Sequence, residues 1–248
     1  MGSCGSILGM LRFPDDGLPT IKAARAFVGG VSTPSKMPGL SWNISAKRCK
    51  LGSILREQIE NSVCASCYAL KGRYRFRNVV AAQERRLAAF DKAASTGNMR
   101  KWAKAMAMLA SSRASKGYFR FFDSGDLQSF AMLHAIIMVA KYAPNVKFWL
   151  PTREYSIIHE ALEFGLISER DFPNNLVIRI SAPSINQTSG WVLADRHPNI
   201  TLSAVYDNGT SPCLRSAYNC PAYKQGGKCG ECRACWQRLN TLIVYPKH

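Results

Sequence analysis

The sequence contains no apolar run of the roughly 20 residues that a membrane span needs, and no apolar segment follows a basic N-terminus. It is also poor in acidic residues, with 16 Asp and Glu against 33 Lys and Arg and a formal net charge of +17. We therefore expect no membrane partner, no secretion and a reducing compartment. The positive charge favours an anionic partner, either nucleic acid or a small anionic substrate.

The cysteines number nine, an odd count that does not suit a framework of paired disulfides. Four of them form a C-terminal motif with the spacing Cys220-x8-Cys229-x2-Cys232-x2-Cys235, and Pro221 directly follows the first. A CxxCxxC run with a more distant cysteine before proline uses the elements of bacterial ferredoxin motifs in the opposite order. The spacing therefore predicts a [4Fe–4S] cluster.

A second cysteine pair, Cys64-x2-Cys67, leaves alternatives open. Two CxxC pairs could meet across the fold as a zinc site, which would leave one of the last three cysteines unused and Cys220 without a role. The pair could instead replace one member of the C-terminal set, or hold a second cluster with Cys49. Reduced structural thiols are a further alternative. The candidate metal ligands are Cys64, Cys67, Cys220, Cys229, Cys232 and Cys235.

Helices and strands are expected to alternate along most of the chain. Apolar spacing predicts helices over 78–96, 98–112, 129–143 and 156–166, and strands within 117–126, 145–155, 175–184, 200–207 and 240–246. This alternation indicates parallel βαβ units, in either an open doubly wound sheet or a barrel. The carboxyl ends of the predicted strands are unusually polar, and we expect them to converge around one opening, as they do in a barrel. We therefore predict an α/β fold with a partial or modified (β/α) barrel.

The N-terminal quarter has a different composition. Residues 1–60 are rich in Gly, Pro and Ser, which predicts an irregular lead-in packed on the domain, with one short strand around 42–44. Residues 61–248 are expected to form a single α/β domain that includes a Cys-rich segment at 213–236.

Four polar residues follow two of the predicted strands: Asp123 and Asp126 after one, Arg153 and Glu154 after the other. Carboxylates suit metal, ribose or amine binding, Glu154 suits a general base, and Arg153 suits a phosphate or carboxylate. Because parallel sheets carry their chemistry at the carboxyl ends of the strands, we predict that these four residues are catalytic. The structural alternatives are a helix cap through Ser124 or Asp126, and an ion pair among these charges.

Residues 71–77, KGRYRFR, alternate basic and aromatic side chains. Proteins that bind single-stranded nucleic acid combine such residues for phosphate contact and base stacking. Arg73, Arg75 and Arg77 are therefore candidate nucleic-acid contacts. The alternative is a solvated basic loop packed by Tyr74 and Phe76.

Several stretches together resemble the phage gene-product-88-like family. They include SVCASCYALKGRYRFRNVVAAQERRL, FRFFDSGDLQS, FWLPTREY and CPAYKQGGKCGECRACW, and the resemblance spans residues 35–236. It implies a bacteriophage origin and a function in the cytoplasm of the infected bacterial host. It does not assign a reaction to the protein. The cysteines that match the family pattern are Cys49, Cys64, Cys67, Cys220, Cys229, Cys232 and Cys235.

A more distant similarity is to radical-SAM enzymes, which pair a partial barrel with a cluster near the strand ends. The chain lacks their CxxxCxxC motif, because Glu60 stands where the first cysteine would be, and this puts S-adenosylmethionine binding in doubt. Cys49 with Cys64 and Cys67 could imitate that motif. We therefore predict an iron–sulfur protein with redox or radical chemistry at the strand ends, served by an electron donor. The alternative is a zinc-stapled, basic nucleic-acid-binding protein without catalysis.

Overall fold

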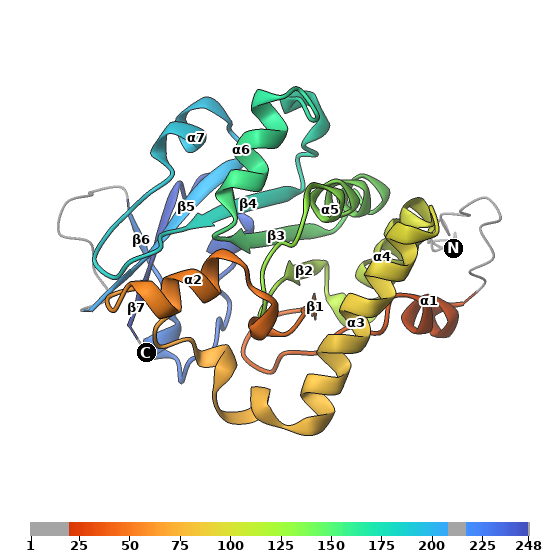
Figure 1. Cartoon of the computed structure of the whole chain (residues 1–248), viewed down its shortest axis with the longest axis horizontal. Coiled ribbons are helices and arrows are strands. Elements are labelled where there is room, and N and C mark those ends of the chain that lie inside the picture. The colour runs from red at the N-terminus through yellow and green to blue at the C-terminus, as the bar shows by residue number, and fades with distance from the viewer. Residues whose placement is uncertain (1–19, 208–216, 248) are drawn as a thin grey trace, which may run out of the picture.

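The computed structural model describes residues 20–207 and 217–247. Within these ranges seven parallel strands form one sheet in the order β1-β2-β3-β4-β5-β7-β6 (Figure 1). The strands are β1 (Leu40–Trp42), β2 (Tyr118–Phe121), β3 (Lys147–Thr152), β4 (Leu176–Ser181), β5 (Ile200–Tyr206), β6 (Tyr218–Asn219) and β7 (Leu242–Pro246).

The strand order follows the chain from β1 to β5, and only β6 and β7 exchange places. A doubly wound sheet would instead reverse its order near the middle. The sheet is not closed, because β1 and β6 are its two edges. The predicted α/β fold with a partial barrel is thus confirmed, and the doubly wound alternative is wrong.

Helices cover one face of the sheet, as the ribbon shows for α4, α5, α6 and α7 (Figure 1). Phe148 and Leu150 of β3 belong to the main apolar core with these helices, whereas Trp149 between them faces the other side of the pleated strand. The helices are α1 (Ile21–Phe27), α2 (Leu51–Gln58), α3 (Arg77–Ser95), α4 (Met99–Ala110), α5 (Phe130–Tyr142), α6 (Tyr155–Glu163) and α7 (Trp191–Arg196).

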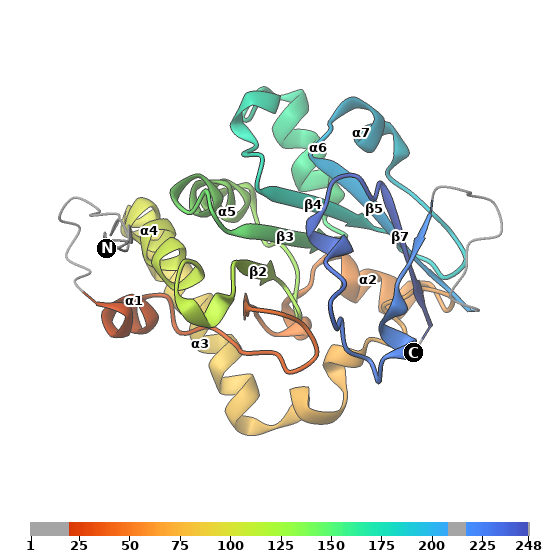
Figure 2. The same cartoon turned by 180° about the vertical axis from the view of Figure 1, so that it is seen from behind.

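The opposite face, which we call the inner face, is covered by the chain segment that precedes β7 (Figure 2). Its short helix η7 (Ala234–Trp236) packs against β3 and β4. The indole rings of Trp149 and Trp236 meet edge to face with 5.3 Å between centroids. Trp236 Nε1 also donates to the carbonyl oxygen of Phe119 at 3.0 Å. These contacts anchor the Cys-rich segment on the inner face.

Residues 20–60 contain more regular structure than the sequence predicts. The side chain of Thr20 caps α1 by accepting a hydrogen bond from Ala23 N at 3.1 Å, and α2 follows after β1. The two helices have 7 and 8 residues, so a helical period is hardly visible in the sequence. The short strand expected here is β1, which pairs with β2 in the main sheet.

Candidate metal centres

Four cysteines, which we call the four-thiol group, lie together at the β6 edge of the sheet. Cys220 directly follows β6, and its N–H donates to the carbonyl oxygen of Val244 on β7 at 2.9 Å. Cys229 interacts electrostatically with Cys220 and Cys232, and Cys235 interacts with Cys220. The four thiols are thus close enough to influence one another, but they are not arranged around one ion position in the described ranges.

Two tyrosines contact sulfurs of this group. Tyr245 Oη and Cys235 Sγ are hydrogen-bonded at 3.2 Å, and Tyr218 Oη and Cys232 Sγ at 3.3 Å. Burial raises the pKa of Cys235 to about 11, and the bond to Cys232 is the main reason that the pKa of Tyr218 rises to about 12. The Cys235 thiol is thus neutral at pH 7 and would release its proton on binding a metal.

Arg179 of β4 lies fully buried beside Cys235. In the described structure its guanidinium donates to the carbonyl oxygens of Leu202, Asn240 and Gln237 at 2.8, 3.1 and 3.4 Å, and no bond goes to a carboxylate. Burial lowers the pKa of Arg179, while Cys235 opposes that effect. A buried cation without an anionic partner is costly, so this site favours negative charge at the sulfurs.

Arg120 of β2 lies between the four-thiol group and the strand ends. Its guanidinium stacks over the ring of Trp149 at 4.2 Å from the centroid. Burial lowers its pKa, but its neighbours, led by Tyr68 and Asp123 and including Cys235, raise it above its usual value. Arg120 is therefore a second fixed positive charge on the inner face.

A second set of cysteines, which we call the three-thiol group, consists of Cys49, Cys64 and Cys67. A β-carbon placed on Gly52 would lie 3.4 Å from Cys64 Sγ and 3.8 Å from Cys49 Sγ, so these two sulfurs flank one point. Cys67 interacts electrostatically with both, and burial raises the pKa of Cys49 and of Cys64. Val63 N–H donates at 2.9 Å to a carbonyl just beyond β4, which brings the group to the strand ends.

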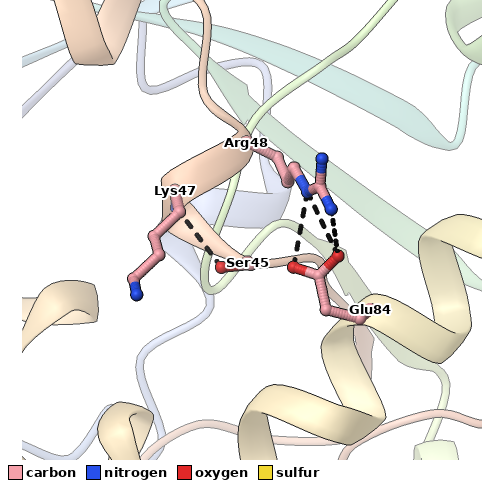
Figure 3. Close-up of polar contacts among 4 residues, drawn as sticks. All are labelled: Ser45, Lys47, Arg48 and Glu84. Atoms are coloured by element: carbon pink, nitrogen blue, oxygen red, sulfur yellow. Dashed lines mark hydrogen bonds and ion pairs between the residues drawn. The ribbon is translucent and has the colours of Figure 1, made fainter.

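Segments distant in sequence hold Cys49 in place. Glu154, directly before α6, accepts a hydrogen bond at its Oε1 from Leu51 N at 2.8 Å, at the N-terminus of α2. On the other side of Cys49, Arg48 pairs with Glu84 of α3 at 2.7 Å (Figure 3). That pair is exposed and contributes less than about 1 kcal/mol, so Glu154 is the stronger restraint.

Asp126 is buried and joins the ends of β2 and β3. Its Oδ1 accepts from Thr152 Oγ1 at 2.6 Å and Leu127 N at 2.7 Å, and its Oδ2 accepts from Arg153 N at 2.9 Å. Burial raises its pKa, and it interacts electrostatically with Cys49. The carboxylate thus places β3 and its neighbours close to the three-thiol group.

The helix-cap interpretation of these residues is wrong. Ser129 caps α5 by accepting a hydrogen bond from Met132 N at 3.2 Å. Asp126 instead bonds across to β3, and the Ser124 hydroxyl is buried without a hydrogen-bond partner among the described residues. The turn between β2 and α5 is too long for either residue to reach the helix N-terminus.

The ion pair expected among the strand-end charges is not found in the described ranges. Arg153 donates from Nε to the carbonyl oxygen of Ala182 at 3.2 Å. It is the strongest positive influence on Cys64, where it opposes the rise in pKa that burial causes. Its partner in sequence, Glu154, is committed to the N-terminus of α2.

Asp123 supports the basic loop, residues 71–77. Its Oδ2 accepts from Tyr74 Oη at 3.1 Å, and its Oδ1 accepts from Ser41 Oγ and Asn43 Nδ2, both at 2.6 Å. The loop is therefore attached at the same strand ends as the three-thiol group. Its exposed residues include Arg73, Arg75, Phe76 and Arg77.

The structure thus divides the predicted metal ligands into two groups. Cys64 and Cys67 influence Cys49 electrostatically, while the four C-terminal cysteines influence one another. Across residues 20–207 and 217–247, no three His, Cys, Asp or Glu side chains are already arranged around one ion position. Part of the Cys-rich segment, residues 213–216, lies outside the described residues.

Sequence reasoning overlooked Arg120 and Arg179, which supply the charge of the inner face. The signal was present, because each is a single arginine within an apolar strand, in YFRF and LVIRIS. A lone charge at such a position is rarely buried unless it has a partner. Only the fold reveals that Arg179 is held by backbone carbonyls and Arg120 by the ring of Trp149, with Cys235 near both.

Comparison with known proteins gives one result. The chain matches the family described as gene product 88 over residues 20–238. No curated protein and no solved structure matches it. Among the helices that the structure describes, none is long and apolar enough to cross a membrane.

Proposed function

The chain belongs to the phage gene-product-88 family, and we propose that it is an iron–sulfur protein whose four-thiol group holds a [4Fe–4S] cluster. Such a cluster supplies one-electron chemistry, for which an electron donor in the infected bacterial cytoplasm is the required partner. In this proposal the substrate binds at the carboxyl ends of the strands. There Asp126 and Glu154 position the cysteines, Asp123 holds the basic loop, and Arg153 is available to an anionic partner.

The observation that carries this proposal is Arg179, a fully buried cation beside Cys235 whose bonds in the described ranges go to backbone carbonyls. Four thiolates around a [4Fe–4S] core are anionic and would supply the charge that Arg179 lacks. Arg120 adds a second cation to the same surroundings. Zinc bound by four thiolates is also anionic, and it is the CxxCxxC spacing that favours the cluster.

The tyrosine contacts support the same assignment. Tyr245 and Tyr218 each contact one sulfur of the four-thiol group, at Cys235 and Cys232. Hydrogen bonds to ligand sulfurs orient the ligands and raise the reduction potential of a cluster. The phenols would act in this way once the thiols have lost their protons.

Metal analysis of anaerobically purified protein tests the proposal. We expect a brown protein that contains iron and acid-labile sulfide in equal amounts. A variant in which Cys220, Cys229, Cys232 and Cys235 are all alanine should lose this iron. A colourless wild-type protein that contains zinc would contradict the proposal.

The second candidate function is binding of single-stranded nucleic acid through the basic loop. Its support is the exposure of Phe76, with 58% of its surface accessible, among three exposed arginines. An aromatic face between cations suits stacking on a base with phosphate contacts on either side. In this alternative the cysteines hold zinc and only stabilise the fold.

Binding measurements separate the two candidates. Replacing Arg73, Arg75 and Arg77 by alanine should abolish salt-sensitive binding of a single-stranded oligonucleotide if the loop binds nucleic acid. The matched control replaces Arg100, Lys101 and Lys104 of α4, which removes the same charge from another helix. Equal losses in both variants would mean that net charge alone causes the binding.

A further inference from the structure

We infer that Tyr68 and Tyr74 form a stacking platform for a base of single-stranded nucleic acid, which the basic loop guides to the strand ends. The inference deepens the proposed function by naming the partner of the strand-end site, and it rests on that function only for the chemistry that follows binding. It differs from the second candidate function, in which Phe76 stacks and the cysteines only stabilise the fold.

The two tyrosines are attached to the end of β2 by their hydroxyl groups. Tyr68 Oη donates to the carbonyl oxygen of Asp123 at 2.6 Å, and Tyr74 Oη donates to Asp123 Oδ2 at 3.1 Å. Asp123 is itself buried and accepts hydrogen bonds from Ser41 and Asn43. The polar tips of both side chains are therefore fixed to a rigid part of the sheet.

The ring of Tyr68 is exposed although its hydroxyl is bound to a buried residue. Tyr68 has 51% of its surface accessible. A surface tyrosine ordinarily buries its ring and leaves the hydroxyl in water, because the ring is the apolar end. Tyr68 does the reverse and so presents an apolar face to solvent in a fixed orientation. A face immobilised in advance binds a planar base at a small cost in conformational entropy.

Tyr74 supports the ring of Tyr68. The two ring centroids are 5.8 Å apart and the ring planes meet at 62°, which is an edge-to-face arrangement. Tyr74 is half-buried, so it is the more enclosed member of the pair. Edge-to-face packing covers at most one face of a ring, and a face of Tyr68 therefore stays free for a base.

The basic loop beside the platform supplies cations for the phosphates. Lys71, Arg73, Arg75 and Arg77 are exposed, and among the described residues none of their side chains has a hydrogen-bond or ion-pair partner. Proteins bind single-stranded nucleic acid by combining such charges with aromatic rings on which the bases stack. The loop and the platform together thus match the phosphates and the base of a single strand.

Arg120 connects the platform to the inner face of the sheet. It interacts electrostatically with Tyr68 and Asp123, and also with Cys235 of the four-thiol group. A base stacked on Tyr68 would therefore lie near the same cation that acts on the proposed cluster. The carboxyl ends of parallel strands are also where such sheets bind their ligands.

The first test measures binding by fluorescence anisotropy, with labelled DNA and RNA oligonucleotides of about 12 nucleotides. Tyr68→Ala should bind whichever form wild type binds at least about tenfold more weakly, which is the usual loss of one stacked base. Tyr68→Phe keeps the ring and should bind within about threefold of wild type. Phe164→Ala removes a ring that is 75% exposed at the end of α6, and this matched control should bind like wild type.

The two Tyr68 variants separate the ring from the hydroxyl. Both should keep the circular dichroism of wild type. Equal losses of affinity in Tyr68→Ala and Tyr68→Phe would show that the hydroxyl bond to Asp123 matters and not the ring face, which would overturn the platform. Failure of wild type to bind either oligonucleotide would overturn it as well.

The second test needs no variant. An oligonucleotide with one 5-iodouracil base, which crosslinks under light to an aromatic side chain stacked on it, is irradiated with the wild-type protein. Mass spectrometry of the digested protein should locate the crosslink at Tyr68 or Tyr74. Crosslinks found only at other residues would contradict the inference.

The third test separates the inference from the proposed iron–sulfur function. In the iron-loaded wild type, the bound oligonucleotide should lower the reduction potential of the cluster, because phosphates near Arg120 oppose added negative charge. Tyr68→Ala at the same oligonucleotide concentration should show a smaller shift. Binding that depends on Tyr68 but leaves the potential unchanged would overturn the role of nucleic acid as the partner of the cluster. A protein that binds the oligonucleotide but holds no iron would contradict the proposed function and support the platform.

Discussion

Arg179 and Arg120 place two positive charges on the inner face of the sheet, where aromatic and aliphatic residues surround them. Each is held by backbone carbonyls or by an aromatic ring, and both interact with Cys235. In a proposed cluster-loaded protein these charges would stabilise the more negative, reduced state. If the four-thiol group holds the proposed cluster, the charges of these two residues would therefore raise its reduction potential.

Replacing Arg179 by Gln should lower the reduction potential of the four-thiol cluster. One charge removed at an effective dielectric constant of about 20 corresponds to roughly 1–2 kcal/mol of reduction free energy. Spectroelectrochemistry of the cluster measures this shift. The control is Arg238→Gln, because Arg238 also donates to a carbonyl, that of Pro173, but has no thiol among its neighbours. Equal potentials in wild type and Arg179→Gln would contradict the electrostatic account.

Gly125, at the strand ends, occupies a position where any side chain would be strained. Its φ is +79°, and a β-carbon there would lie 2.3 Å from Ile44 Cγ1 and 2.8 Å from the Ile44 carbonyl oxygen. Gly125→Ala should lower the free energy of unfolding by about 2–4 kcal/mol, since left-handed backbone and overpacking add together. Gly165→Ala should cost only about 1 kcal/mol, because its φ is +65° but nothing lies within 4 Å. Urea denaturation that gives equal losses would refute the close packing.

At the scale of elements, α2 is the part of the fold that brings Cys49 to the strand ends. The helix has no side-chain cap of its own, and Glu154 serves in that place from across the fold. A carboxylate at a helix N-terminus stabilises the unpaired N–H groups and the helix dipole. Glu154 thereby couples the geometry of the three-thiol group to β3 and α6.

Glu154→Ala should destabilise α2 by about 1–2 kcal/mol, which is the usual cost of losing an N-cap. Hydrogen exchange of amides in residues 51–58 would measure this locally, and urea denaturation globally. Glu57→Ala is the control, because Glu57 lies on the same helix with 74% of its side chain exposed. Faster exchange throughout the sheet, rather than in α2, would show that Glu154 acts on the whole fold.

The sequence predicted the long helices and the buried strands of this fold but not its short connecting elements. α3, α4 and α5 have clear apolar faces, whereas α1 and α2 are too short to show a period. The C-terminal cysteine motif was recognisable because its ligands are local in sequence. The three-thiol group was only one of several open alternatives, because Cys49 is separate from the Cys64–Cys67 pair in sequence and is held near it by Glu154, which lies about a hundred residues further on.

At the scale of the whole molecule, the Cys-rich segment takes the place of a second layer on the inner face. Its apolar cluster is small, and joins Trp149, Trp236 and Ile243 to the buried Cys235. The segment has no long helix or strand of its own between Cys220 and β7. A bound cluster would therefore supply much of the energy that keeps this layer folded.

Removing the metal should reduce stability mainly in this layer. We expect the melting temperature to fall by roughly 10 °C after anaerobic iron chelation, with faster hydrogen exchange in residues 220–236. The variant without the four C-terminal cysteines serves as the control and should respond less. If chelation changed neither melting nor exchange in wild type, a structural contribution of the metal would be ruled out.

The most direct test of the central claim is the Mössbauer spectrum of anaerobically purified protein enriched in ⁵⁷Fe. The account predicts the quadrupole doublet of [4Fe–4S]²⁺, present in wild type and lost in proportion when Cys220, Cys229, Cys232 and Cys235 are replaced. A spectrum without cluster iron, from a folded protein that contains zinc instead, would contradict it.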